Sequence, residues 1–179
     1  NHSNLCCGKI FGQEKNVTNA AIAKMNLFLH GAADFNIMQG DTLREPKILA
    51  GGELAKFDCV IANPPFSLEK WGSVEWSSDK YGRNIWGTPS DSCGDYAWIQ
   101  HMIKSMGPGN SRMAVVMPQG ILFRGNEEGN IRKKLVESDK VEAVVTLGDK
   151  LFYGTGLSPC FLIIRNLKPA EHSSRILMI

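Results

Sequence analysis

The sequence predicts an α/β domain whose sheet is mainly parallel and closes with an antiparallel pair of strands. The first part of the chain reads strand, helix, strand, loop, strand, which is the order typical of a parallel sheet. Near the end, residues 141–147 and 160–164 form two strands rich in Val and Ile. Residues 148–159, which join them, are too few for a helical crossover, so we expect an antiparallel pair.

The composition is that of one globular domain. With 179 residues the chain can bury a substantial core, and fractions of 43% hydrophobic and 21% charged residues are ordinary for such a domain. A formal net charge of +2 excludes a polycationic coat on nucleic acid, so any basic surface must be local. Neither a membrane-spanning run nor a signal peptide is visible, and we expect a cytoplasmic protein.

The cysteines predict neither a disulfide framework nor a metal site. Their number is odd and their spacing is not that of metal ligands, so we interpret them as structural thiols in a reducing compartment. The five thiols belong to Cys6, Cys7, Cys59, Cys93 and Cys160.

The first predicted strand, residues 9–14, ends on the carboxylate of Glu14. Asn16 or Thr18 can cap the helix that follows, and Gly31 ends this helix. The apolar residues of the helix share one face at helical spacing, as expected for packing against a sheet. They are Ala21, Ile22, Met25, Phe28 and Leu29.

The stretch 57–66 contains the strongest candidate for a functional site. Residues 60–62 predict a short buried strand, which Pro64 and Pro65 end because proline lacks the amide hydrogen of a sheet ladder. Asn63 therefore lies at the carboxyl end of a strand, where open α/β sheets bind ligands. The Asn63 carboxamide oxygen and the Pro64 carbonyl can accept both hydrogens of a planar amine, and the Phe66 ring can cover its face. Alternatively, the motif is only a turn with a packed ring.

Carboxylates end the two strands before Asn63. Glu14 lies where nucleoside-binding α/β folds hold ribose hydroxyls, and Asp41 follows a second strand at 35–38 and can accept a hydrogen bond from an adenine amino group. Either acid alone could be a cap or turn residue. Because three successive strands end on Glu14, Asp41 and Asn63, we expect a ligand-binding site at this edge of the sheet.

Residues 67–94 show no sustained period, and a loop of this length is usually functional or disordered. Its aromatic and basic side chains would suit stacking on unpaired bases, although packing of the rings against the domain is slightly favoured. These side chains are Trp71, Trp76, Tyr81, Arg83 and Trp86.

The second half predicts two more helices and further strands. Residues 96–106 have helical spacing, 113–117 form a strand that stops at Pro118, and 174–179 begin another extended segment. Asn126 is expected to cap a helix that buries Ile131 and Leu135. Basic residues beside them could contact phosphate or form a solvated face: Arg132, Lys133 and Lys134.

Several segments together resemble one family. Asn63-Pro64-Pro65-Phe66 is similar to the catalytic motif of amino-directed methyltransferases that use S-adenosylmethionine, and the chain closely resembles the modification subunit of type I restriction-modification systems. The likeness covers nearly the whole chain. Its further motifs are Phe11-Gly12-Gln13-Glu14, Ala23-Lys24-Met25-Asn26-Leu27, Gly40-Asp41-Thr42-Leu43, Leu122-Phe123-Arg124-Gly125, Ile131-Arg132-Lys133-Lys134-Leu135 and Leu151-Phe152-Tyr153-Gly154-Thr155-Gly156.

The resemblance implies a class I, Rossmann-like methyltransferase sheet with helices on both faces and a C-terminal antiparallel hairpin. Residues 1–179 would be part of the catalytic domain, without the family's first strand and the glycine-rich loop that follows it. The implied reaction is methylation of the exocyclic amino group of adenine in double-stranded DNA, with the base flipped out. The implied partners are the specificity and restriction subunits. Alternatives are a protein-glutamine methyltransferase and a non-catalytic scaffold or DNA-binding fragment.

The resemblance also assigns residues to roles. Glu14 would hold the ribose of S-adenosylmethionine, and Asp41 with Thr42 would contact its adenine. Lys15 stands where the family usually has an apolar residue over that adenine. The target adenine would be held by Asn63, Pro64 and Phe66 of the four-residue catalytic motif, with two aromatic residues lining the same pocket. The catalytic residues are Asn63, Pro64, Pro65 and Phe66, and the pocket residues are Phe152 and Tyr153.

Overall fold

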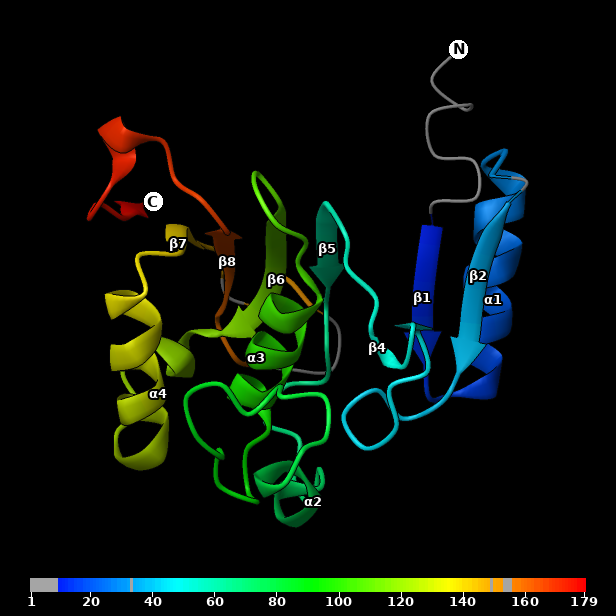
Figure 1. Ribbon diagram of the computed structural model, residues 1–179, viewed down its shortest axis with the longest axis horizontal. Helices are drawn as coiled ribbons and strands as arrows, with labels where there is room; N and C mark the ends of the chain where they lie inside the picture. The colour runs from blue at the N-terminus through cyan, green and yellow to red at the C-terminus, as the bar shows by residue number, and fades with distance from the viewer. Residues whose placement is uncertain (1–9, 33, 149, 153–155) are drawn as a thin grey trace. The chain divides into compact units, whose positions relative to one another are not determined.

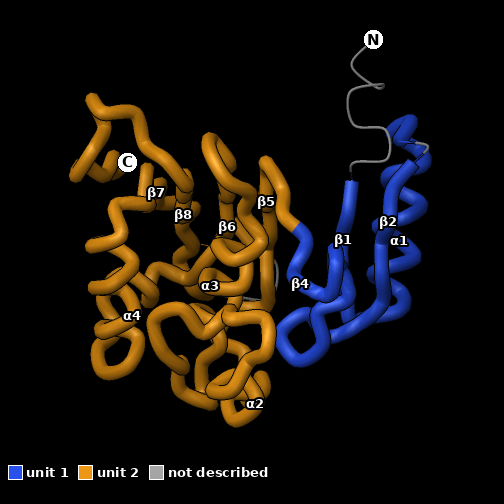
Figure 2. Tube along the Cα trace, in the orientation of Figure 1, with its two compact units in different colours: residues 1–55 blue, residues 56–179 orange. Residues whose placement is uncertain are grey.

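The computed structural model describes residues 10–32, 34–148, 150–152 and 156–179 (Figure 1). The chain forms two compact units, Asn1–Ala55 and Lys56–Ile179 (Figure 2). No helix within the described ranges is both long enough and apolar enough to cross a membrane.

The first unit is a strand–helix–strand element. Strand β1 (Ile10–Glu14) pairs in parallel with β2 (Phe35–Gln39), and α1 (Val17–Leu29) connects them. The side chain of Asn16 caps α1 by accepting a hydrogen bond from the Asn19 amide at 3.1 Å, as predicted. After the helix, Gly31 has a φ of +79°, which glycine adopts without steric cost. The predicted strand, helix, strand order is confirmed for this unit.

The apolar face predicted for α1 is largely exposed. Ala20 is the buried residue of the helix, whereas Leu29 is 75% exposed. The same holds for the other large apolar residues of that face: Ile22, Met25 and Phe28. The prediction that this face packs against the sheet is therefore wrong within the first unit. The least exposed residues, Ala20, Ala23 and Leu27, lie on the other side of the helix, because small residues allow a helix to approach a sheet closely.

The connection between β2 and the second unit contains a hairpin that was not predicted. Strands β3 (Leu49–Ala50) and β4 (Glu53–Leu54) pair antiparallel across Gly51 and Gly52. Both glycines have positive φ values, +60° and +86°, as the two central residues of a type I′ turn require. The Gly-Gly pair in the sequence was the signal for this hairpin.

The second unit is built on a five-stranded mixed sheet in the order β5-β6-β8-β7-β9. Strands β5 and β6 are parallel, β8 is antiparallel to both β6 and β7, and β9 is parallel to β7. The predicted antiparallel pair is thus confirmed as β7 and β8, and β8 also inserts between β7 and β6. The strand bounds are β5 Cys59–Ala62, β6 Arg112–Pro118, β7 Val141–Thr146, β8 Pro159–Arg165 and β9 Leu177–Met178.

Two helices pack on this sheet and complete the core. Helix α3 (Asp95–Ser105) contributes Tyr96, Ile99 and Met102, and α4 (Asn126–Glu137) contributes Ile131 and Leu135. Short helices lie between these elements: α2 Ser73–Ser77, η2 Gln119–Leu122 and η3 Ala170–His172.

Two local predictions for this unit were wrong. Asn126 does not cap α4, because Gly125 takes the cap position and Asn126 is the first helical residue, with a φ of +54°. Strand β5 is not fully buried. It ends the strand order of its sheet, and Ile61 is 76% exposed.

Residues 67–94 form a packed segment. Trp71 and Trp76 are each 2% exposed, and their rings meet edge to face with centroids 5.5 Å apart. The guanidinium of Arg83 lies 4.7 Å from the Trp76 ring centroid and forms a buried ion pair with Asp79 at 2.6 Å. For Trp71 and Trp76, the interpretation that the rings pack against the domain is therefore correct, and stacking on unpaired bases is not available to them.

Candidate active site

The Asn63–Phe66 loop begins where β5 ends at Ala62. Because β5 and β6 are parallel, their carboxyl ends lie at the same edge of the sheet. Within the loop Asn63 is exposed, Pro64 is buried and Phe66 is half-buried. The loop thus presents a carboxamide at the surface beside a ring that is partly held by the protein.

Phe66 contacts Phe152, the other aromatic residue expected at this site. The two rings meet edge to face, with centroids 6.4 Å apart and planes at 89°. This geometry suits the opposed charge distributions of ring edge and ring face. Tyr153, also expected here, lies outside the described residues.

The backbone just after Phe66 is held by a buried carboxylate. The Ser67 amide donates a hydrogen bond to Oδ1 of Asp95 at 2.8 Å, and the Gly94 amide donates to the Leu68 carbonyl at 2.9 Å. Ser67 has a φ of +49°, a left-handed conformation that costs a residue with a side chain about 1–2 kcal/mol. The contact to Asp95 offsets part of that cost and fixes the exit of the loop.

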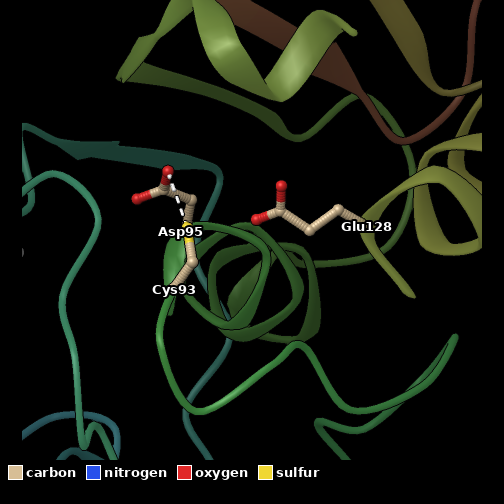
Figure 3. A group of neighbouring side chains, drawn as sticks. All are labelled: Cys93, Asp95 and Glu128. Atoms are coloured by element: carbon tan, nitrogen blue, oxygen red, sulfur yellow. Dashed lines mark hydrogen bonds between the residues drawn. The ribbon is translucent and has the colours of Figure 1, made fainter. Parts of the chain in front are cut away.

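Asp95 belongs to a cluster with Cys93 and Glu128, whose ligand-type atoms lie within 4.8 Å of one another (Figure 3). The Cys93 thiol donates to Oδ2 of Asp95 at 3.3 Å, and Glu128 reaches the cluster from α4. The guanidinium of Arg124 contacts all three: Nη2 lies 2.6 Å from Asp95, Nε 3.2 Å from Glu128 and Nη1 2.6 Å from Cys93.

The cluster fits an arginine better than a metal ion. Arg124 supplies a positive charge to both carboxylates, with a planar fork suited to them. Burial raises the pKa of the Cys93 thiol to about 11, so the thiol beside Arg124 keeps its proton near neutral pH. Burial also raises the pKa of Glu128, while the hydrogen bond with Cys93 and the charge of Arg124 oppose this rise. Sequence reasoning missed this cluster because its members are brought together by tertiary packing.

A pocket of about 420 Å³ borders the loop on the side of Ser67 and Arg124. It lies in the second unit, where the segment after β6 meets the segment before β8. Its lining residues are Ser67, Pro118, Gln119, Gly120, Phe123, Arg124, Gly156, Leu157 and Ser158. The pocket therefore shares Ser67 with the exit of the Asn63–Phe66 loop.

The predicted cofactor residues lie in the first unit. Glu14 ends β1, pairs in register with Gln39 and accepts a hydrogen bond from the Asn16 amide at 2.7 Å. Asp41 follows β2 closely, so both carboxylates lie at the same edge of this two-stranded sheet. Thr42 is half-buried next to Asp41.

Asp41 has an additional local role. Its Oδ1 accepts hydrogen bonds from the backbone amides of Leu43 and Arg44, each at 3.2 Å, and its Oδ2 forms an ion pair with Nζ of Lys15 at 2.9 Å. Burial raises the pKa of Asp41, but the Lys15 and amide hydrogen bonds outweigh burial and the net pKa is lowered. The carboxylate is thus ionised near neutral pH, and Lys15 is its ion-pair partner.

The chemistry of these side chains fits S-adenosylmethionine. Carboxylates accept hydrogen bonds from the hydroxyl and amino groups that a nucleoside presents, and Glu14 and Asp41 are half-buried acceptors at one sheet edge. The predicted residues therefore fall into two groups. Glu14, Asp41 and Thr42 belong to the first unit, and Asn63–Phe66 with Phe152 belong to the second.

Comparison with known proteins identifies similar sequences along nearly the whole chain. The N-6 DNA methylase family matches residues 3–179. The methylase subunit of the MjaVII type I restriction enzyme from Methanocaldococcus jannaschii is 35% identical over 178 residues, which covers 95% of this chain and 30% of that protein. The HindI methylase subunit from Haemophilus influenzae is 32% identical over 161 residues, covering 89% and 35%. The chain thus spans about a third of the length of these curated relatives.

Solved structures agree with the sequence matches. The crystal structure of a type I restriction-modification methyltransferase subunit from Streptococcus thermophilus has a TM-score of 0.80 and 32% identity, covering 88% of this chain and 34% of that one. A structure from Listeria monocytogenes, described as a class I S-adenosylmethionine-dependent methyltransferase, has a TM-score of 0.66 at 14% identity and covers 94% and 48%. The expected class I methyltransferase fold is confirmed.

Proposed function

Because the chain belongs to the N-6 DNA methylase family, we propose that it is part of the catalytic domain of an adenine-specific DNA methyltransferase. The protein would transfer a methyl group from S-adenosylmethionine to the exocyclic amino group of adenine, as the modification subunit of a type I restriction-modification system. The observation that carries this proposal is the Asn63–Phe66 loop at the end of β5, with its ring held against Phe152.

The loop is suited to capturing an amine. The exposed Asn63 carboxamide oxygen and the Pro64 carbonyl would each accept one hydrogen of the adenine amino group. Holding both hydrogens orients the nitrogen lone pair, which is otherwise delocalised into the ring, toward the methyl donor. Positioning the two reactants in this way can lower a barrier by about 7–11 kcal/mol. As the N–C bond forms, the S–C bond of the sulfonium breaks and leaves a neutral thioether. The methylated nitrogen is then acidic and loses its extra proton to water, so the loop needs no strong base.

The aromatic residues would hold the base outside the duplex. An adenine reaches the loop only after it leaves the stack, at a cost of about a few kcal/mol. Stacking on the half-buried Phe66 ring would offset this cost, and Phe152 fixes the ring by its edge contact. Tyr153 would line the same pocket.

S-adenosylmethionine, when bound, supplies the methyl group as an electrophile. Glu14 would accept hydrogen bonds from the ribose hydroxyls, and Asp41 with Thr42 would contact the adenine end. Lys15 pairs with Oδ2 of Asp41 and contributes to its lowered pKa. We expect these residues to set cofactor affinity, while the loop sets the rate of transfer.

The relatives support a proposal about the partners of this protein. The MjaVII and HindI proteins are methylase subunits of type I restriction enzymes. We propose that this protein works with a specificity subunit that selects the DNA site and with a restriction subunit, in the cytoplasm where the DNA lies.

The proposal is tested with the full-length protein and its specificity subunit. They are incubated with S-adenosylmethionine labelled in the methyl group and duplex DNA carrying the recognised site, and the nucleosides are then separated. We expect the label on the amino group of adenine. Label on cytosine would contradict the proposal, and label on protein alone would favour a protein-glutamine methyltransferase.

A further inference from the structure

We propose that Asp95 and Arg124 are positioning residues for methyl transfer, acting through the backbone of Ser67 on the Asn63–Phe66 loop. The inference rests on the proposed function. It adds a role for two residues outside the catalytic motif, one at the start of α3 and one before α4.

The first step of the argument is the direct contact to the loop. Ser67 follows Phe66, and its amide donates to Oδ1 of Asp95 at 2.8 Å. Asp95 is 0% exposed, so water does not compete for this acceptor. With a φ of +49°, Ser67 is in a conformation that persists where its surroundings hold it. Asp95 is therefore placed to fix the direction in which the chain leaves Phe66.

The second step is what orients Asp95. Its other oxygen, Oδ2, pairs with Nη2 of Arg124 at 2.6 Å, so the carboxylate bridges a guanidinium and the Ser67 amide. Arg124 is itself held, because Glu128 contacts its Nε and Arg132 donates to its carbonyl at 2.7 Å. The result is a chain of contacts from α4 through Arg124 and Asp95 to the loop.

The third step links position to rate. Asn63 and Pro64 act by accepting hydrogen bonds, and such contacts need the acceptors to be correctly placed. A displacement of about 1 Å at an active site can cost roughly 100-fold in rate. Loss of the Asp95 anchor would free Ser67 and, with it, the end of the loop that carries Phe66.

A purely structural ion pair is the competing explanation, and the chain offers a matched control for it. Asp79 also bridges an arginine and a backbone amide: its Oδ1 pairs with Arg83 at 2.6 Å, and its Oδ2 accepts the Arg83 amide at 2.7 Å. This pair is buried in the same unit, and the Asp79 carboxylate accepts hydrogen bonds from Arg83 rather than from the Ser67 amide. Asp79→Ala therefore removes an equivalent ion pair without removing the anchor.

The test uses full-length protein with its specificity subunit, and it compares Asp95→Ala, Asp95→Asn and Asp79→Ala with the unsubstituted protein. The measurements are kcat per folded molecule, the Kd for S-adenosylmethionine and the melting temperature. We expect Asp95→Ala to lower kcat about 100-fold, with cofactor Kd changed by less than about threefold. The asparagine side-chain oxygen can still accept a hydrogen bond from the Ser67 amide. We therefore expect the kcat of Asp95→Asn to be at least about tenfold higher than that of Asp95→Ala. Asp79→Ala should melt earlier and keep its kcat.

Arg124→Gln tests the same idea should Asp95→Ala fail to fold, because it keeps the Asp95 acceptor and removes the group that orients it. We expect its kcat to fall about tenfold. The inference is overturned if every Asp95 or Arg124 variant that folds has a kcat within about threefold of that of the unsubstituted protein, which is the result expected for Asp79→Ala. Equal losses in Asp95→Ala and Asp95→Asn would also overturn it. Absence of adenine methylation by the unsubstituted protein would instead overturn the proposed function itself.

Discussion

The ring of Phe152 meets the ring of Phe66 edge to face, at 6.4 Å between centroids. The contact joins the end of β5 to the segment that precedes β8, two parts of the chain that are far apart in sequence. It gives Phe66 a fixed partner on one side. An incoming base would therefore meet a ring that is already oriented, which reduces the entropy lost on binding.

Phe66→Ala should weaken binding of the target base by about 1–3 kcal/mol, the usual scale for loss of an aromatic stacking partner. Phe66→Tyr and Phe66→Trp should keep most of the activity, because a ring remains. The measurements are methylation rate, cofactor affinity and melting temperature on the same full-length variants. If Phe66 only packs, the alanine variant would melt early and still methylate normally per folded molecule.

Glu14→Ala should weaken S-adenosylmethionine binding about 10- to 100-fold, because it removes a charged acceptor for two hydroxyl groups. Calorimetric titration of the full-length protein measures the effect. Glu45→Gln is the matched control, since Glu45 is an exposed acid in the same unit. An unchanged Kd in Glu14→Ala would remove Glu14 from the cofactor site.

His101 should make the stability of the protein depend on pH. Burial, reinforced by the charge of Arg83 and opposed by Asp79, lowers the pKa of His101 from 6.5 to about 3. Between pH 6.5 and pH 3, His101 binds a proton in the unfolded chain but not in the folded chain. The contribution of His101 to the unfolding free energy is therefore fully present above pH 6.5 and is lost as the pH falls toward 3.

Urea unfolding of the full-length protein at pH 7.5 and pH 5.0 measures this effect. Compared with His101→Gln, the unsubstituted protein should lose up to about 2 kcal/mol more of its unfolding free energy over this interval. The same loss in both proteins would show that His101 is not the group responsible.

Local signals in the sequence were sufficient for much of the fold. The short connection between β7 and β8 predicted an antiparallel pair, and Asn16 was named as one of two possible caps for α1. Pro64 and Pro65 correctly marked the end of β5. Each of these features depends on residues close together in the chain, which is why pattern and propensity could identify them.

Features that depend on tertiary packing were not predictable in this way. Nothing in the spacing of Ser67, Asp95 and Arg124 indicates that they form one chain of contacts. Burial was similarly misjudged for Ile61. The residues of β5 alternate between exposed and half-buried, and a strand's own residues do not show whether other elements cover the sheet face on which Ile61 lies. The Phe66–Phe152 contact was accessible only through resemblance to a family.

The central claim is that the Asn63 carboxamide captures the amine during methyl transfer, and the single-turnover rate of Asn63→Ala tests it most directly. The full-length variant, its specificity subunit and saturating S-adenosylmethionine are mixed with duplex DNA, with Asn130→Ala as a control that removes an exposed carboxamide from α4. We predict a loss of about 10²–10³-fold, the usual effect of removing one preorganised hydrogen-bonding group, with cofactor Kd unchanged. A single-turnover rate that matches the Asn130→Ala control would contradict the account.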